Sequence, residues 1–403
     1  MRRLKQSVSL FLLFMLLGCS SPLSPQATLV VLSPSRMPLQ TKSPQPTLAP
    51  KVTVTPSALF SPQPVPTKSQ PPVTAAQTPS SQLLLPVGHM RIGQETRGLS
   101  VQGEYAYVGL ESALAVVDIS ELSQPRLVTC TEFPDAPEHG EWVSSAHVTS
   151  DYAYLGTTWS RLIVIDVSNP REPVPVGSYK DIDTFYSVTV QDHYAYALHG
   201  YRWYGSMIVI DISDPANPIK VAEIPGEASD LAIQGTYVYL ADKYNRDIHK
   251  EYEIEGGLRV VDISDPVHPQ ELASLLWAQG GLEGIDVNEG YAYATTFDGI
   301  GRIVDVSNPA TPFEASVCEF GGKAYGILVT GDYALIGGTD EQDNEGLHIL
   351  DISDPVRPIA LDFYKTEFPS HMTLFERDEQ LYLAVLHWSG SLRIFRVLVG
   401  RPR

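Results

Sequence analysis

One short text recurs six times in this chain of 403 residues, and it limits the possible fold more than any other feature. It reads Leu-Ile-Val-Ile-Asp-Val-Ser-Asn-Pro from Leu162 and Met-Ile-Val-Ile-Asp-Ile-Ser-Asp-Pro from Met207. The aspartates that end the apolar runs are Asp118, Asp166, Asp211, Asp262, Asp305 and Asp351, and a degenerate seventh copy carries Arg396 instead. Successive copies lie 43 to 51 residues apart, a period that is typical of repeat architectures.

The residues of each copy predict β structure. The run from Ile163 to Ile165 is apolar, β-branched and too short for a buried helix. The aspartate that follows can accept hydrogen bonds from backbone amides two residues further on, and proline fixes φ within the turn. Upstream of each copy lies a tight polar turn followed by alternating residues such as Tyr105 and Tyr107. This second theme predicts a hairpin, so each unit supplies four strands.

We therefore expect an all-β fold, a seven-bladed β-propeller with four-stranded blades. A single blade exposes both of its faces, so blades must stack in a ring to bury them. The segment Leu83 to Ile92 is similar to the outer strand of other units, and the last unit lacks that strand. The sequence thus predicts that the N-terminal strand pairs in the last blade and closes the ring.

The repeated text resembles the LVIVD repeat family of bacterial and archaeal surface β-propellers. The resemblance covers six clear units and a weak seventh, nearly all of Leu83 to Val399. It implies a propeller fold and an extracytoplasmic location, as in a bacterial surface lipoprotein. It carries no catalytic motif to transfer to this chain.

The N-terminal residues predict export and lipidation. Arg2, Arg3 and Lys5 precede an apolar core that ends in Leu-Leu-Gly-Cys, which makes residues 1–18 a signal peptide. Gly18 before Cys19 resembles the lipobox of bacterial lipoproteins, which implies a lipid anchor on Cys19 in the cell membrane or outer membrane. The alternative is an ordinary secreted protein with a chance cysteine.

Composition divides the rest of the chain into a stalk and a folded domain. Residues 19–82 are rich in proline, serine and threonine and hold no acidic residue, which predicts a disordered stalk behind the lipidated cysteine. Residues 83–399 form the predicted propeller. All 47 acidic but only 21 of the 28 basic residues follow residue 82, a net charge of about −26. Such a charge argues against nucleic-acid binding, which depends on neutralising phosphates.

Two further cysteines, Cys130 and Cys318, belong to the first and fifth units. These units are not neighbours in the predicted ring. A disulfide needs Cα atoms within about 7 Å, so we expect two unpaired thiols.

The connections predict two different faces of the ring. The uniform Asp-Ile-Ser-Asp-Pro turns share one face with the short hairpin turns, and we name this the turn face. Long, dissimilar connections gather on the opposite face, the loop face, and binding sites are commonly built on such loops. Aromatic and basic residues of two of these loops are candidate binding residues: His199, Tyr201, Arg202, Trp203, Tyr204, Tyr244 and Arg246. Trp142, Trp159, Trp277 and Trp388 are expected on or near this face as well.

Metal and catalytic motifs are scarce. Asp340, Asp343 and Glu345 lie at nearby positions of one loop and offer oxygen ligands for calcium, although their spacing does not match an EF-hand. A solvated acidic turn is the simpler interpretation, so no metal or cofactor is expected otherwise. The sequence contains no His-x-Glu-x-x-His pair, Gly-rich phosphate loop or Gly-x-Ser-x-Gly elbow.

Aligned innermost strands indicate which residues surround the channel mouth. The alignment places seven residues there, and two histidines follow a little further along. These candidates are Arg97, Ser144, Tyr186, Ser229, Glu283, Tyr325 and Ser370, with His147 and His371. A polar ring of this kind could hold a small ligand or support catalysis, and the sequence assigns no catalytic residue.

The sequence thus favours a lipid-anchored, extracytoplasmic module that binds a protein or glycan of the cell envelope. The alternative is a propeller enzyme, a hydrolase or lyase, with its site at the channel mouth. A purely structural envelope component is a third hypothesis.

Overall fold

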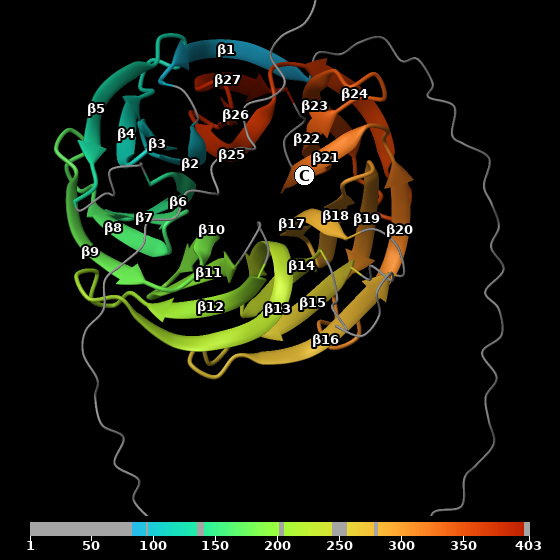
Figure 1. The fold of residues 1–403 in the computed structure, drawn as a ribbon. Coiled ribbons are helices and arrows are strands. Elements are labelled where there is room, and N and C mark those ends of the chain that lie inside the picture. Colours follow the sequence, from blue (N-terminus) through green and yellow to red (C-terminus); the bar gives the residue numbers. More distant parts are fainter. Residues whose placement is uncertain are drawn as a thin grey trace, which may run out of the picture. The chain divides into compact units, whose positions relative to one another are not determined.

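The computed structural model describes residues 83–93, 96–134, 141–200, 205–243, 256–277 and 281–398. These residues form 27 β-strands (Figure 1). Within them there is no helix with the length and apolar character that crossing a membrane requires. The predicted signal peptide, Cys19 and the stalk lie outside the described residues, so the domain boundaries at 18 and 82 stay predictions.

The strands form seven blades around a central channel (Figure 1). The first blade contains β2 (Arg97–Gln102), β3 (Tyr105–Leu110), β4 (Ala113–Asp118) and β5 (Arg126–Glu132). The second contains β6 (Val143–Thr149), β7 (Tyr152–Thr157), β8 (Arg161–Asp166) and β9 (Val174–Lys180). The third contains β10 (Thr184–Gln191), β11 (Tyr194–Gly200), β12 (Gly205–Asp211) and the first half of β13 (Ile219–Gln234).

The remaining blades repeat this order. The fourth uses the second half of β13 with β14 (Tyr237–Asp242), β15 (Gly256–Asp262) and β16 (Gln270–Trp277). The fifth contains β17 (Leu282–Asn288), β18 (Tyr291–Thr296), β19 (Ile300–Asp305) and β20 (Phe313–Glu319). The sixth contains β21 (Lys323–Thr330), β22 (Tyr333–Thr339), β23 (Glu345–Asp351) and β24 (Ile359–Lys365). The seventh contains β25 (Pro369–Arg377), β26 (Gln380–His387) and β27 (Ser391–Val397), and β1 (Leu84–Arg91) completes it.

Strand β13 departs from the repeat because it belongs to two blades. It is the outermost strand of the third blade and the innermost strand of the fourth, so these two blades form one sheet of seven strands. Its 16 residues pair with β12 through the first half and with β14 through the second. The other five sheets have four strands each, and they confirm the predicted four-stranded blade.

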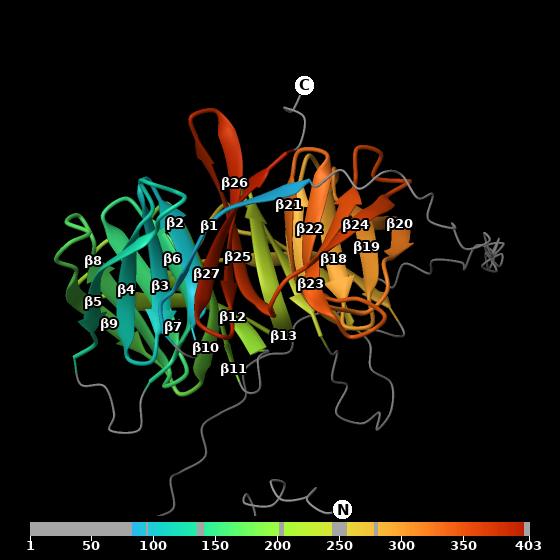
Figure 2. The same cartoon turned by 90° about the horizontal axis from the view of Figure 1, so that it is seen from above.

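Strand β1 closes the ring as predicted. It pairs antiparallel with β27 from Leu84 opposite Val397 to Arg91 opposite Ser391. The seventh blade therefore combines both ends of the propeller sequence, which joins the beginning of the ring to its end (Figures 1 and 2). This pairing covers the edge that β27 would otherwise expose.

The repeated aspartates stabilise the turns on the turn face. In all six clear repeats, an aspartate Oδ1 accepts a hydrogen bond of 2.8 to 2.9 Å from the amide of the serine two residues further on. Each aspartate also faces the tyrosine that begins the second strand of its blade, as Asp118 faces Tyr105. In the seventh blade Arg396 takes this place opposite Tyr382, and the Asp-Ile-Ser-Asp-Pro turn is absent there because β27 is followed by the end of the propeller.

The hydrophobic core is divided among the junctions between blades. Seven clusters of buried residues occur in the described ring, and each combines side chains from two neighbouring blades. Alternation along a strand sends neighbours to different junctions: Tyr107 packs toward the second blade and Val108 toward the seventh. Each blade therefore buries both of its faces only when the blades on either side are present.

The two predicted thiols are confirmed as unpaired. Cys130 lies on β5 of the first blade and Cys318 on β20 of the fifth, and both are free.

Replacing Leu84 tests the closing strand. Its side chain is 1% exposed and packs into the cluster between the sixth and seventh blades. We expect Leu84→Ala to lower the free energy of unfolding by about 2–5 kcal/mol, because it removes buried methyl groups and leaves a cavity. Urea denaturation followed by tryptophan fluorescence measures this change. The exposed His89 on the same strand provides the control, and His89→Ala should stay within about 0.5 kcal/mol of the parent; equal effects of the two substitutions would contradict the proposed role of β1.

Candidate functional site

The innermost strand of every blade is irregular near the loop face. At this level the pairing between the first and second strands shifts by one residue, which is a β-bulge. Six of the seven residues that sequence alignment placed at the channel mouth are the extra residues of these bulges: Ser144, Tyr186, Ser229, Glu283, Tyr325 and Ser370. In the first blade the extra residue is Gly98, and the predicted Arg97 directly precedes it. A bulge changes the direction of its side chain relative to the regular strand, so these residues do not share the environment of ordinary strand positions.

Four of the bulge residues connect one blade to the next. The Tyr186 hydroxyl donates a 2.6 Å hydrogen bond to the Ala228 carbonyl, and Ser229 Oγ donates one of 2.6 Å to the Leu282 carbonyl. Ser144 donates in the same way to the Phe185 carbonyl, and Ser370 lies 3.5 Å from the carbonyl oxygen of Thr96. Three of the acceptors directly precede the next bulge residue, and Thr96 lies two residues before Gly98. These four hydroxyls therefore stabilise the ring.

The other three predicted residues, Glu283, Tyr325 and Arg97, make different contacts on the loop face. Glu283 pairs with Lys243 at 2.7 Å. Tyr325 packs against Phe297 and Phe368, with ring centroids 5.8 and 4.8 Å apart. These contacts involve other side chains and not the backbone carbonyls of a neighbouring blade.

Arg97, which directly precedes the bulge of the first blade, lies among tryptophans. Its guanidinium carbon is 4.8 Å from the centroid of Trp388 and 5.7 Å from that of Trp142. Both distances are within the range of cation–π attraction. The guanidinium plane is thus held in place by two large rings.

Together these contacts form one continuous group, which we name the aromatic arc: Phe297, Tyr325, Phe368, Trp388, Arg97 and Trp142. Phe368 continues the chain of contacts to Trp388, 5.8 Å away between centroids. The side chains of Phe297, Trp388 and Trp142 are 49%, 47% and 37% exposed, respectively. Large aromatic side chains that contact each other yet stay this exposed form an apolar surface that the ring itself does not bury.

The predicted binding loops are only partly described. Tyr201, Arg202, Trp203, Tyr204, Tyr244 and Arg246 lie outside the described residues. His199 belongs to β11 and is 7% exposed, with its ring nitrogens 3.9 Å from Asp181 and 3.8 Å from Glu223. It therefore lies in the wall of the ring and not on the binding surface where the sequence interpretation placed it.

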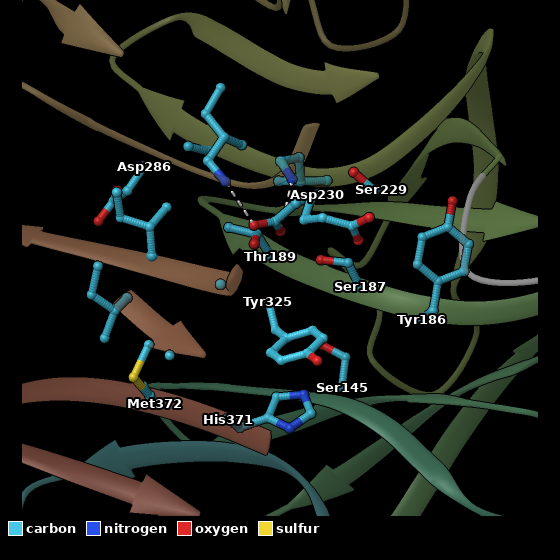
Figure 3. A pocket seen from close by; sticks show the side chains of 18 of the residues that line it. Ser145, Tyr186, Ser187, Thr189, Ser229, Asp230, Asp286, Tyr325, His371 and Met372 are labelled. Carbon is cyan, nitrogen blue, oxygen red and sulfur yellow. Dashed lines mark hydrogen bonds between the residues drawn. The ribbon is translucent and has the colours of Figure 1, made fainter. Parts of the chain in front are cut away.

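A cavity of about 470 Å³ occupies the channel (Figure 3). Six of the nine predicted residues line it: Tyr186, Ser229, Glu283, Tyr325, Ser370 and His371. Arg97, Ser144 and His147 are not among its lining residues. His147 lies on β6, where burial lowers its pKa and favours the neutral imidazole.

Sequence analysis missed two aspartates that border the cavity, Asp230 on β13 and Asp286 on β17. Each side chain is half-buried in the wall of the channel. Burial raises the pKa of Asp230 to about 7 and that of Asp286 to about 6, although each carboxylate accepts two backbone hydrogen bonds that act in the opposite direction. In the sequence both look like ordinary polar strand residues, and only the register identifies them as channel residues.

These aspartates hold the neighbouring innermost strand. Asp230 Oδ2 accepts a 3.1 Å hydrogen bond from the amide of Ile285, and Asp286 Oδ2 accepts one of 2.7 Å from the amide of Val329. The amides that face the channel would otherwise lack protein partners, because an innermost strand has no further strand beside it.

His371 faces the same cavity from β25 (Figure 3). Burial, with a smaller contribution from the Arg97 charge, lowers its pKa to about 4, although a hydrogen bond to the Ser144 backbone acts in the opposite direction, so the imidazole is neutral near pH 7. Its Nδ1 atom is buried without a hydrogen-bond partner among the described residues.

The acidic turn with Asp340 is organised by its own groups. Asp340 accepts hydrogen bonds from the amides of Gln342 and Asn344, and Asp343 pairs with Lys323 at 2.8 Å. In the described part of the chain, no group of three or more His, Cys, Asp or Glu side chains is placed to hold a metal ion. Calcium at Asp340, Asp343 and Glu345 stays a prediction.

The LVIVD repeat model matches residues 93–131, 143–181, 186–223, 225–246, 253–276, 279–319 and 321–366. The chain belongs to the LVIVD repeat family. The matched segments correspond to the first six blades, and two of them cover the fourth blade. None of them reaches β25. The seventh blade, which contains the degenerate copy, therefore diverges most from the LVIVD pattern.

Solved propeller structures support the same fold. A chain of the "Mitotic Checkpoint Complex" is 11% identical, with a TM-score of 0.60, covering 82% of this chain and 100% of that one. The Neurospora crassa Pan2 WD40 domain is 12% identical, with a TM-score of 0.57 and coverage of 79% and 97%. The computationally designed Ika8 protein is 11% identical, with a TM-score of 0.56 and coverage of 79% and 88%. At these identities the likeness concerns the fold alone. No curated protein matches this LVIVD-repeat chain.

The raised pKa values of the channel aspartates predict a pH dependence of stability. Asp230 and Asp286 ionise freely in the unfolded chain near pH 4 but resist ionisation in the folded ring. The raised pKa values therefore add to the free energy of unfolding below about pH 4, where both groups are protonated. This contribution is lost as the pH rises through about 6 to 7. At pH 8 we expect the free energy of unfolding of Asp230→Ser to be at least that of the parent. The gain should not exceed about 4 kcal/mol. Urea midpoints from pH 4 to 8 measure this, and a difference between variant and parent that is independent of pH would contradict it.

Proposed function

We propose that this LVIVD-repeat protein is a lipid-anchored, extracytoplasmic binding module of the cell envelope. Its ligand, a protein or a glycan, contacts the loop face at the aromatic arc. The observation that carries the proposal is the arc itself. It places exposed aromatic side chains and one arginine beside the channel mouth. Because these side chains are exposed, they add little to the stability of the propeller.

The composition of the arc suits recognition. Tryptophan, tyrosine and arginine dominate the binding energy of many interfaces, since they offer large contact areas with few rotatable bonds. The same rings can stack on the apolar face of a sugar. The arc also changes little on binding, because each member already packs against another: Trp388 contacts both Phe368 and Arg97. A preorganised surface loses less conformational entropy when a ligand binds.

The N-terminal segments fit such a role. A lipid on Cys19 would keep the protein at the membrane, and the stalk of residues 19–82 would let the ring reach ligands well above it. If fully extended, a chain of this length reaches on the order of 190 Å at about 3.1 Å per residue. The net charge of about −26 on residues 83–403 favours cationic or neutral ligands over nucleic acids.

An enzyme acting at the channel mouth is the second candidate. Its specific support is the pair of cavity carboxylates, Asp230 and Asp286, whose raised pKa values would suit proton transfer near neutral pH. Against it, each carboxylate is already bonded to two backbone amides. Turnover of a glycan or ester that Asp286→Ser abolishes, in protein whose ligand binding is unchanged, would favour this second function.

Substitutions in the arc test the binding surface. We expect Trp388→Ala and Phe297→Ala each to weaken ligand binding by about 10-fold or more, because a central aromatic residue contributes about 2 kcal/mol or more to a typical interface. A glycan microarray and photo-crosslinking to envelope proteins, each followed by quantitative binding of the ligand found, provide the measurements. Both side chains lie near the surface, so folding should be preserved, which circular dichroism checks.

Trp159 supplies the matched control. It is 48% exposed on the same face, in the hairpin between β7 and β8, but makes no ring contact with the arc. We expect Trp159→Ala to leave binding unchanged. Equal losses for Trp159→Ala and Trp388→Ala would refute the arc as the specific surface.

Replacing Cys19 tests the anchor. In cells of the source organism, we expect Cys19→Ser to abolish incorporation of labelled fatty acid and to release the protein from the membrane fraction. The serine hydroxyl cannot form the thioether that a lipoprotein anchor needs. A Cys130→Ser variant should remain lipidated, since Cys130 lies within the ring. Retention of Cys19→Ser in the membrane at the parent's level would contradict the lipid anchor.

A further inference from the structure

The side chains that line the channel cavity carry an excess of negative charge. Its lining includes three acidic side chains, Asp230, Glu283 and Asp286, but no lysine or arginine. Glu283 is compensated from outside the lining, since Lys243 pairs with it at 2.7 Å. Neither Asp230 nor Asp286 has a salt bridge in the described part of the chain. Two carboxylates thus face the cavity without a cationic partner.

The repeats of this chain show that holding the neighbouring strand does not require these charges. Asp230 occupies the position of Ser145 in the second blade, where Ser145 Oγ accepts a 3.1 Å hydrogen bond from the amide of Val188. Asp286 occupies the position of Ser100 in the first blade, where Ser100 Oγ accepts a 3.1 Å bond from the amide of Val148. A neutral hydroxyl performs the same structural task at both positions.

The carboxylates therefore carry a charge beyond their structural task. A buried charge without a partner is unfavourable, and burial indeed raises the pKa values of both groups. Each carboxylate oxygen accepts one amide bond and keeps a second lone pair for another donor. Both groups can thus bind a cation without releasing the backbone.

His371 provides an independent indication of a ligand. It lines the same cavity from the seventh blade, and its buried Nδ1 has no hydrogen-bond partner in the described structure. A neutral imidazole offers one nitrogen that accepts a hydrogen bond. The hydroxyls of Ser145, Ser187 and Thr189 also face the cavity (Figure 3).

We propose that the channel cavity binds a small organic cation that bears primary ammonium groups, held by Asp230 and Asp286. An ammonium group brings three donors and a positive charge, which matches a wall of carboxylates, hydroxyls and an imidazole. The volume of about 470 Å³ is that of a small-molecule site. A bare metal ion fits less well, because the described residues provide no group of three His, Cys, Asp or Glu ligands. Tyr325 belongs to both the cavity lining and the aromatic arc, but Asp230 and Asp286 are not members of the arc.

Isothermal titration of the full-length protein with putrescine and spermidine at pH 8 tests the proposal. We expect saturable binding with one site per chain, and no binding of 1,4-butanediol, the neutral counterpart of putrescine. The double variant Asp230→Ser, Asp286→Ser should bind at least 10-fold more weakly. Its folding should be preserved, since serine holds the equivalent strands elsewhere in this ring. Glu341→Gln, at an exposed carboxylate on the loop face, should bind like the parent.

The pH dependence sharpens the test. Amine binding should weaken at least 10-fold from pH 8 to pH 5.5, because the ligand then competes with protons for Asp230 and Asp286. The other titratable groups at the cavity are Glu283 with its partner Lys243, the Tyr186 and Tyr325 hydroxyls, and His371. Among these, the pKa of Tyr325 is raised and that of His371 is lowered to about 4, so neither changes charge over this interval.

Several outcomes would overturn the proposal: no binding of either amine, equal binding by the double variant, equal binding of 1,4-butanediol, or tighter binding of calcium chloride than of the amines. Trp388→Ala separates this site from the proposed function. It should lose the envelope ligand and keep amine binding, so either site can fail while the other stands.

Discussion

The structure depends on the packing between neighbouring blades. A blade is a thin sheet with apolar residues on both faces, and each of the seven buried clusters in the described ring draws its side chains from two blades. No blade can bury its residues alone, so the free energy gained from apolar burial becomes available only as the ring assembles. Pairing of β1 with β27 completes this arrangement, because it supplies the last strand of the last blade from the opposite end of the domain.

The innermost strands expose backbone amides and carbonyls along the channel, and side chains of neighbouring blades form hydrogen bonds with these groups. Three levels of contacts join successive blades there. Hydroxyls such as that of Tyr186 donate to carbonyls at the bulges, and Ser145 and Asp230 accept from amides below them. At the turn face, Gln102 donates to the Ser150 carbonyl and Arg377 to the Gly103 carbonyl. Each level satisfies backbone groups that an edge strand would otherwise expose.

The sequence predicts the parts of this protein that repeat. The recurring aspartate turns and tyrosine hairpins fix the blades, and their alignment placed Tyr186 and Ser229 at the channel mouth, where the structure has both residues lining the cavity. Continuity of β13 escaped prediction, because Pro225-Gly226 looks like a break. Gly226 lies directly against the Arg259 guanidinium, where a Cβ would clash, and Arg259 donates to the Pro225 carbonyl. That contact comes from a strand more than 30 residues downstream, which no local pattern reveals.

Function is encoded where the repeats differ, and this explains why the candidate sites were hard to find. Phe297 and Phe368 of the aromatic arc lie in short connections, and the text Thr-Glu-Phe-Pro around Phe368 also occurs at residues 131–134, so no local pattern singles these residues out. The arc exists only because four blades bring its residues together. The channel aspartates differ from Ser145 and Ser100 by one functional group at equivalent positions. In a ring of similar blades, the equivalent residue of another blade shows what structure alone requires. A departure that is unfavourable for stability, such as a buried carboxylate in place of a hydroxyl, therefore indicates a role that the fold does not need.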